Sequence, residues 1–479
     1  MHGDGGTQDD TCNPGDSRQC YDGQQGTQGV GPCVGGNQSC GQDGLWGTCN
    51  GEVVPAPEIC GDNIDNNCNG KVDEDEDADG DGWTTCGGDC CDSTECGNPA
   101  EVNPGAFEIA GDGVDNDCDG MVDNALPLCD SGLTAGSTNA LDYAKAIDLC
   151  QTSGSGNPAK DATGPKWGVI SAKWTMADGT GTATAAGHSI RPHFGTGTVP
   201  QVGMSVVELS TANAAASDDT AAPAYQDLEN TISSHGSSGF PSDWYTANGS
   251  KLPNDSKCPD PEGSTANDPQ MLTLQVRVPT NAHSFSFHVN FFSSEFPEYV
   301  CSPFNDFFVV LLDSSYSGNG SGAANPTDKN LAFYEEAGGD KVPVGVNLAF
   351  DNTGLFTECK NGSTGCANFG DGPTGTINTC KEITDLSGTG LDGADADSCD
   401  ADSLEGGGTG WLVTSGNVTP GEVMTLRIAI WNTSDHQYNS LAVIDGFTWS
   451  ADPSNPGTII MSRPRRAGDA PVLSSNMNY

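Results

Sequence analysis

Three short stretches of the sequence place oxygen-bearing side chains at every second position and then a glycine. Calcium takes about six to eight hard oxygen ligands, which proteins often supply from alternate positions of a loop that turns sharply at a glycine. The spacing therefore predicts calcium loops. The expected ligands are Asp65, Asn67, Asn69, Asp73 and Glu76 in the first stretch, Asp77, Asp79, Asp81, Asp89 and Asp92 in the second, and Asp115, Asp117, Asp119 and Asp123 in the third.

The first and third stretches belong to an internal repeat, because residues 58–73 return in register as residues 108–123. Acidic positions, a glycine, a cysteine and an Ile/Val pair recur, although Leu126 stands where the first loop has Glu76. A lone loop of this kind is often a solvated turn. Three close together, two of them in a repeat, are a much more specific signal.

The charge of the chain limits its partners. The 479 residues include 18 Lys and Arg against 66 Asp and Glu, which gives a formal net charge of −48. Nucleic acids and anionic lipids attract basic patches, so neither is expected as a partner. Such a charge also opposes compaction unless cations neutralise it. No apolar run is long enough to predict a transmembrane segment.

Cysteine usage indicates an oxidising compartment. Thirteen of the 20 cysteines precede residue 130, in a segment with few large apolar residues, which needs cross-links or metal to stay folded. We expect an extracellular or outer-surface protein whose polar start follows a removed export signal, or whose reading frame begins further upstream. The disulfides expected in the second half are Cys129–Cys150, Cys258–Cys301, Cys359–Cys366 and Cys380–Cys399, with the other cysteines pairing in the front modules.

Composition divides the chain into a disordered lead (1–11), a Cys-rich disulfide module (12–57), the repeated metal-binding region (58–130), a β-sandwich (139–450) and a tail (451–479). A capping Asn and helical apolar spacing predict a short helix over 139–149. Alternating apolar residues predict strands over 168–176, 272–278, 285–291, 306–312, 346–350, 410–414, 422–430 and 441–449. The expected fold class is mainly β, with small disulfide- and calcium-stabilised loop modules followed by an antiparallel jelly-roll-like β-sandwich.

Two family resemblances add to this interpretation. Residues 58–124 resemble the MopE-type metal-binding motif of secreted bacterial proteins, through the string E-I-C-G-D-x-x-D-N-x-C-x-G-x-V-D-E at 58–74. That family is named for a copper-binding surface protein, which makes copper a rival to calcium. Copper prefers imidazole, thioether or thiolate ligands, whereas this stretch is rich in carboxylates and has no histidine.

The second half, over about residues 139–450, resembles the choice-of-anchor L domain. The matching strings are Gly187–Arg191, Phe291–Tyr299, Asn305–Phe308, Ser434–His436 and Ile444–Phe447. The resemblance implies an exported bacterial protein at the cell surface. No anchor is recognisable after Trp449, so the mode of attachment stays open.

Other acidic and histidine residues are candidates for a metal site or a catalytic site. His188 and His193 are candidates for a metal pair, although a structural role is more common for such a pair. Glycoside cleavage needs two acids across a cleft, and an acyl-transfer triad needs a serine that no G-x-S-x-G motif supplies. The residues considered are Glu295, Glu298 and Asp306 for cleavage, Asp435, His436 and Asp445 for a triad, and Asp313, Asp435 and Asp445 for a structural calcium.

The function expected from the sequence is that of a non-enzymatic extracellular or cell-surface calcium-binding protein. Structural calcium would stiffen the front region, and the sandwich would present a surface for adhesion to a glycan, a matrix or a surface protein, or for self-association. The alternatives are a subunit of an extracellular fibre or sheath, a copper-binding surface protein and a secreted glycan-active hydrolase.

Overall fold

The computed structural model describes residues 11–73, 77–92, 97–124, 126–155, 166–318, 322–335, 339, 341–365, 372–381, 383–395, 399, 403–462 and 464–465. The predicted ligand Glu76 and nearly all of the predicted lead lie outside the described residues. The chain forms two compact units, residues 1–104 and residues 105–479, which we call the front unit and the sandwich unit. The boundary falls between the two copies of the repeat.

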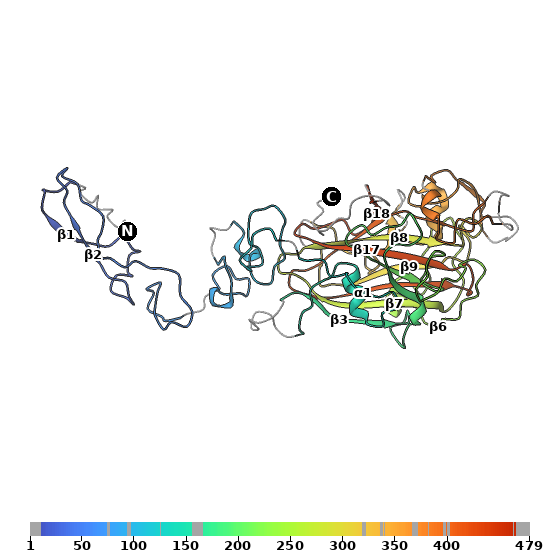
Figure 1. Ribbon diagram of the computed structural model, residues 1–479, viewed down its shortest axis with the longest axis horizontal. Helices are drawn as coiled ribbons and strands as arrows, with labels where there is room; N and C mark the ends of the chain where they lie inside the picture. The colour runs from blue at the N-terminus through green and yellow to red at the C-terminus, as the bar shows by residue number, and fades with distance from the viewer. Residues whose placement is uncertain are drawn as a thin grey trace. The chain divides into compact units, whose positions relative to one another are not determined.

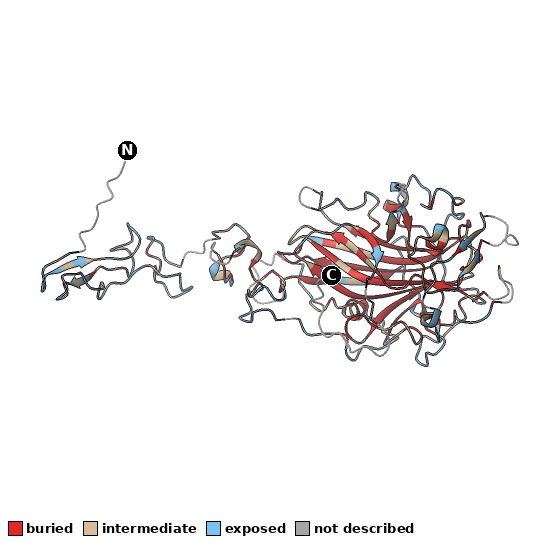
Figure 2. Cartoon of the chain, turned by 90° about the horizontal axis from the view of Figure 1, so that it is seen from above, coloured by how far each residue is buried: buried red, intermediate tan, exposed pale blue. Residues whose placement is uncertain are grey.

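The front unit has little regular structure and few buried apolar side chains (Figures 1 and 2). Its described elements are the antiparallel strands β1 (Ser17–Cys20) and β2 (Gly36–Ser39) and the 3-10 turns η1 (Thr85–Gly87) and η3 (Pro99–Glu101). Disulfides join Cys12–Cys40, Cys20–Cys49, Cys33–Cys68 and Cys60–Cys86. Cross-links therefore supply the cohesion that a small apolar core cannot.

The sandwich unit contains two antiparallel sheets (Figure 1). One has the order β18-β15-β8-β17-β5-β4, with β14 paired to β8, and the other has the order β3-β7-β16-β9, with β6 paired to β7. The strands of the first sheet are β4 (His188–Arg191), β5 (Val206–Ser210), β8 (Ser284–Ser293), β14 (Gly407–Gly408), β15 (Leu412–Asn417), β17 (Ser440–Ser450) and β18 (Gly457–Ile460). Those of the second are β3 (Gly168–Thr175), β6 (Ser237–Ser238), β7 (Ala266–Arg277), β9 (Phe307–Asp313) and β16 (Val423–Thr433).

Shorter elements connect and cover these sheets. The helices are α1 (Ala140–Ala146), α2 (Ser242–Ala247), η5 (Ala185–Gly187), η6 (Val346–Asn352) and η7 (Ile383–Leu386). Two small hairpins pair β10 (Phe333–Glu335) with β11 (Lys341–Pro343) and β12 (Gly362–Thr364) with β13 (Gly375–Ile377). Among the described residues, no helix is long and apolar enough to cross a membrane.

One large hydrophobic core lies in this unit. It contains Leu274 of β7, Phe287 of β8 and Ile428 of β16, each fully buried. The opposite faces of the strands are covered as well: Trp244 of α2 packs near Phe307 and Trp431. Figure 2 shows the resulting concentration of buried residues in the strands.

The predicted fold class is confirmed as mainly β with multiple antiparallel sheets, and most predicted strands and the helix after Asn139 form. The strand predicted over 346–350 is wrong, because Val346, Leu348 and Ala349 are buried by the 3-10 turn η6 instead. A short apolar run does not distinguish a strand from a buried turn. The segment beyond residue 450 also contributes a strand, since β18 pairs with β15.

The disulfides partly match the expected pattern. Cys129–Cys150 and Cys258–Cys301 are confirmed. The pairings Cys359–Cys366 and Cys380–Cys399 are wrong, because Cys359 bonds to Cys380. The hairpin of β12 and β13 explains this, since its two strands bring the residues that flank it together. No described cysteine is free.

Candidate metal sites

The second acidic stretch, in the front unit, gathers five carboxylates that the sequence predicted as ligands. Oxygens of Asp77, Asp79 and Asp81 lie within 4.8 Å of one another, and so do oxygens of Asp79, Asp89 and Asp92. Asp79 belongs to both groups and therefore joins them. A hard cation bound there would find oxygens from both halves of the loop.

Backbone amides fix the shape of this loop. The Asp77 carboxylate accepts hydrogen bonds from the Gly80 and Gly82 amides, at 2.7 and 3.0 Å, and Gly82 has a φ of 94° that favours glycine. Asp92 Oδ1 accepts from the amides of Ala78 and Asp79, so it closes the loop across 14 residues. The fold thus positions these carboxylates in advance of any ion.

Neighbouring elements hold the loop in place. The backbone amide of Trp83, a residue that is almost fully buried, donates to Asp81 Oδ1, and the Asn103 side chain donates to Asp81 Oδ2 at 2.7 Å. Thr84 then caps η1, and the Cys60–Cys86 disulfide ties this turn to the first repeat. Asp89 is only 5% exposed.

The carboxylates of this loop repel one another. Burial raises the pKa of Asp79, Asp81 and Asp89, that of Asp81 to about 6, and the strongest charges acting on them are those of other acids. Oδ2 of Asp79 and Oδ2 of Asp89 are buried and have no hydrogen-bond partner among the described residues. A divalent cation would supply the missing partner and neutralise the repulsion.

The two repeat copies share one local design. In the first, Asp65 accepts hydrogen bonds from the amides of Asn69 and Gly70. In the second, Asp115 accepts from the amides of Asp119 and Gly120. The first acid of each loop therefore stabilises the turn that follows it.

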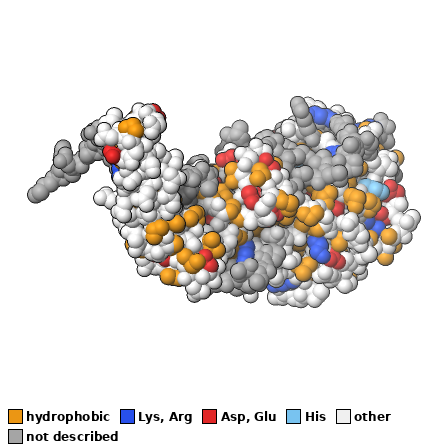
Figure 3. All heavy atoms as spheres, turned by 60° about the vertical axis from the view of Figure 1, so that its left-hand side comes forward, with side chains coloured by type: hydrophobic (Ala, Val, Ile, Leu, Met, Phe, Trp, Pro, Cys, Tyr) orange, Lys and Arg blue, Asp and Glu red, His pale blue; other side chains and the backbone are white. Residues whose placement is uncertain are grey.

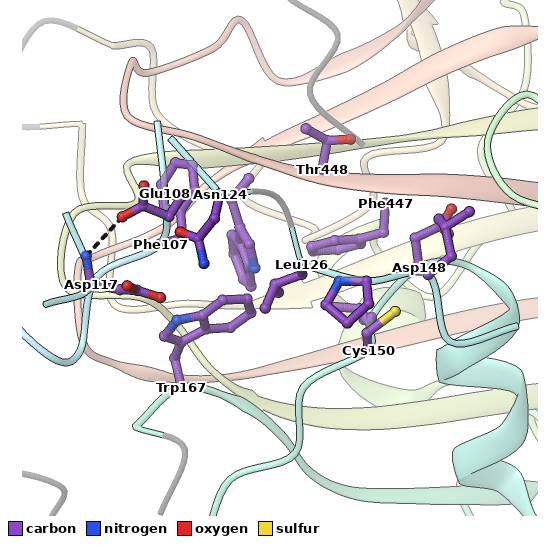
Figure 4. A pocket seen from close by; sticks show the side chains of 14 residues that line it. Phe107, Glu108, Asp117, Asn124, Leu126, Asp148, Cys150, Trp167, Phe447 and Thr448 are labelled. Atoms are coloured by element: carbon purple, nitrogen blue, oxygen red, sulfur yellow. Dashed lines mark hydrogen bonds between the residues drawn. The ribbon is translucent and has the colours of Figure 1, made fainter. Parts of the chain in front are cut away.

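Each copy also contains an acid that sequence reasoning missed. Glu58 Oε1 accepts from the Asn67 amide and Glu108 Oε1 from the Asp117 amide, at 2.7 and 3.0 Å. In both residues Oε2 is buried, and no described residue forms a hydrogen bond with it. Oxygens of Glu108, Asp115 and Asp117 lie within 4.8 Å of one another, and burial raises the pKa of Asp117 to about 6 (Figure 4). The signal was available, because an acid begins each copy of the repeat.

The later predicted ligands of the repeats point elsewhere. Asp73 accepts hydrogen bonds from the amides of Gly61 and Asn63, and Asp123 accepts from those of Gly111 and Gly113. These carboxylates therefore fold the start of each copy back onto its end. Asp119 Oδ1 accepts from the Met121 amide, and neither Asp119 nor Asp123 joins the group around Glu108.

The histidine and triad candidates do not assemble into sites. His188 stacks on Trp174 with ring centroids 3.9 Å apart and contacts Gln270, and burial lowers its pKa to about 4. His193 is a half-buried residue on the loop that follows β4. His436 pairs with Asp268 rather than with Asp445.

The acids considered for a hydrolase or for a calcium in the sandwich do not all gather at one site. Glu295 and Asp306 are buried together, with the Asp306 amide donating to Glu295 Oε2, and burial raises the pKa of both. Burial raises the pKa of Glu298 to about 8. Asp313 forms ion pairs with Lys329 and Arg427, so it does not share a site with Asp435 and Asp445.

The fold and the acidic loops together define a class: a disulfide-rich β-sandwich protein with a repeated metal-binding motif. The chain belongs to the Choice-of-anchor L domain family, whose model matches residues 205–448, just over half of the chain. A second model, described as a Putative metal-binding motif of the MopE copper-binding type, matches residues 55–74 and 97–124. The second acidic stretch lies between these two segments. No curated protein and no solved structure matches the chain.

These memberships fix the broad character of the protein. The metal-binding motif is present, and groups of described acids within and between its two matched segments could hold a metal ion. The disulfides and the choice-of-anchor domain suggest an exported surface protein.

Proposed function

We propose that this protein binds calcium through its Asp/Asn-rich loops and uses the ions as structural elements outside the cell. The observation that carries the proposal is the convergence of Asp77, Asp79, Asp81, Asp89 and Asp92 on one loop. Like charges are held close together there, with two buried carboxylate oxygens left without a partner. Calcium relieves both costs at once, because it accepts many oxygen ligands in flexible geometry.

The ligand set favours calcium over copper. Carboxylate and amide oxygens are hard ligands, whereas copper is held best by nitrogen and sulfur. The two cysteines inside the repeat loops, Cys68 and Cys118, are disulfide-bonded and so offer no thiolate. The described groups of acids also include no histidine.

Calcium in the front unit would act as part of its folding. A segment with so little buried apolar surface gains stability from anything that binds only its folded form. An ion that neutralises several carboxylates converts its binding free energy into folding free energy. The loops would then form a calcium-dependent rigid spacer, and no catalytic step is required of them.

The sandwich unit is proposed to present a surface for adhesion or assembly, to a glycan, a matrix or surface protein, or another copy of the chain. Exposed apolar residues of this unit support a protein partner or self-association. Ile232 is 67% exposed, Ile459 67% and Val122 55%. Figure 3 shows hydrophobic side chains gathered on the surface of the molecule.

Calorimetric titration of the chelator-stripped, oxidised full chain tests the calcium proposal. The parent is expected to bind several calcium ions, and a variant that combines Asp77→Asn, Asp79→Asn and Asp81→Asn is expected to bind fewer. Asp43→Asn is the matched control, since Asp43 is a front-unit acid that accepts from the Leu45 amide and belongs to none of the described acidic groups. Unchanged calcium binding by the triple variant, or uptake of copper without calcium, would contradict the proposal.

A further inference from the structure

Three acids from distant parts of the sequence meet inside the sandwich unit. The Cys129–Cys150 disulfide, with Cα atoms 5.4 Å apart, brings the segment of Asp130 beside that of Asp148. A hydrogen bond from the Phe447 amide to the Ile147 carbonyl, at 2.9 Å, then sets Asp148 beside the Asp445 end of β17. Asp148 itself has a φ of 70°, just after α1.

One short backbone segment orients two of these carboxylates. Asp130 Oδ2 accepts from the amides of Met204 and Ser205, at 2.6 and 2.9 Å. Asp445 Oδ2 accepts from the amides of Gln201 and Val202. The residue between these pairs is Gly203, where an added Cβ would stand 2.5 Å from Asp130 Oδ2. The connection from β4 to β5 is thus shaped to receive both side chains.

The remaining oxygens of the three acids have no partner. Asp130 Oδ1, Asp445 Oδ1 and both oxygens of Asp148 are buried and make no hydrogen bond with the described residues. Asp130 is 4% exposed and Asp445 is fully buried. Each amide-bound oxygen therefore fixes a carboxylate whose second oxygen still needs a partner.

Repulsion among the three carboxylates adds to the cost of burying them. Burial and the charge of Asp130 raise the pKa of Asp148 to about 7. Burial and the charge of Asp148 raise the pKa of Asp445 well above its usual range. Protonation would let one carboxyl donate a hydrogen bond to a neighbouring carboxylate, whereas a divalent cation would neutralise the group with all of its carboxylates ionised.

We propose that Asp130, Asp148 and Asp445 bind one calcium ion in the sandwich unit, at a site separate from the Asp/Asn-rich loops. Only oxygen ligands are offered, and the nearby Cys129 and Cys150 are consumed in their disulfide. The three carboxylates are not among the groups of described acids whose oxygens all lie within 4.8 Å of one another, so the ion would contact fewer than three of them directly and complete its coordination shell with water or backbone carbonyls. In Figure 4, Asp148 lies beside Phe447 and Cys150, away from Glu108 and Asp117 of the repeat.

The ion would join two parts of the fold that are far apart in sequence. It would connect the disulfide-bonded start of the unit, which carries Asp130 and Asp148, to the central strand β17, which carries Asp445. Calcium binding would therefore stabilise the sandwich itself, independently of whether the front loops bind metal.

The test compares calcium bound per chain and thermal unfolding for the full-length parent, Asp148→Asn and Asp445→Asn. Each variant is expected to bind one calcium ion fewer than the parent. In chelator, each should melt at the same temperature as the parent or higher, because a repelling carboxylate is removed. In calcium, each should lose the part of the melting-temperature increase that belongs to the sandwich unit.

Glu208→Gln is the matched control, since Glu208 is a buried acid of β5 that contacts Ser189 and lies outside the three-acid group. It should keep the parent's calcium count. The front-loop triple variant should keep this ion while losing others, so failure of the loop proposal and failure of this one are distinguishable. The inference is overturned if Asp148→Asn and Asp445→Asn bind as much calcium as the parent. If Asp445→Asn does not fold, Asp148→Asn decides alone.

Discussion

The front unit and the sandwich unit solve the same problem, cohesion of a strongly acidic chain, in different ways. The sandwich unit buries whole strands, and its core includes Leu274, Phe287 and Ile428. The front unit buries few large side chains, among them Trp83 and Val102, and is cross-linked by disulfides around closely spaced acids. The comparison teaches that acidic residues have two settings here. In the front unit they line loops that we propose hold ions in place of a core, and in the sandwich unit they are enclosed by one.

The largest expected effect is the loss of a core side chain in the sandwich unit. Phe287→Ala should lower the free energy of unfolding of that unit by about 3–5 kcal/mol, because Phe287 is fully buried between the sheets. Urea unfolding followed by tryptophan fluorescence measures it. Ser286→Ala, on the same strand and half-buried, is the control. A comparable loss of protease resistance in the front unit would break the proposed independence of the two regions.

Removing a disulfide should have a smaller effect, confined to the front unit. Replacing both Cys33 and Cys68 by alanine opens a loop of 35 residues and should cost that unit about 2–4 kcal/mol. Limited proteolysis with mass spectrometry locates the new cleavage sites. They should lie in the front unit, whereas cleavage within the central strands β7 or β8 would show that the sandwich depends on this cross-link.

Glu208 should make the stability of the sandwich unit depend on pH. Burial raises its pKa in the folded protein to about 8, above the usual value of 4.5. Its stabilising contribution is therefore complete below pH 4.5 and is lost as the pH rises towards and through 8. In the parent, the free energy of unfolding should fall as the pH rises, and Glu208→Gln should reduce the slope of that fall by at most about 1.4 kcal/mol per pH unit. Urea unfolding between pH 5 and 9 measures this, with exposed Glu262→Gln as control, and identical slopes for parent and Glu208→Gln would contradict it.

The smallest expected effect concerns α1. Asn139 Oδ1 accepts a hydrogen bond from the Leu141 amide at the start of this helix. Asn139→Ala should therefore cost about 1 kcal/mol, whereas Asn139→Ser should retain most of the stability because serine caps a helix as well. Chemical denaturation distinguishes the two variants. Equal stabilities would mean that burial of Tyr143 alone holds the helix.

Local patterns made much of this structure predictable. Alternation from Leu272 to Val278 predicted a strand within the longer β7, and the alternating acids predicted the gathering of Asp77, Asp79 and Asp81. Such signals come from residues that are close in sequence, and their spacing can be read directly from the chain. The capping Asn139 was recognisable for the same reason.

Tertiary contacts were harder to predict from the sequence. A disulfide and a sheet contact bring together Asp130, Asp148 and Asp445, so no sequence spacing predicts this group. The Cys359–Cys380 bond follows from a hairpin that the sequence did not reveal. Glu108 was the exception, because its place at the start of the repeat could have been read as a ligand position.

The most direct test of the central claim is hydrogen exchange of the oxidised full chain with calcium and with chelator. The account predicts that removing calcium raises backbone exchange over residues 77–92, where amides are held by carboxylates that would bind the ion. The interior of β7, β8 and β16 should stay protected in both conditions, with any change in the sandwich unit confined to the surroundings of Asp148 and Asp445. Equal protection of residues 77–92 in calcium and in chelator would contradict the claim that ions replace a core in the front unit.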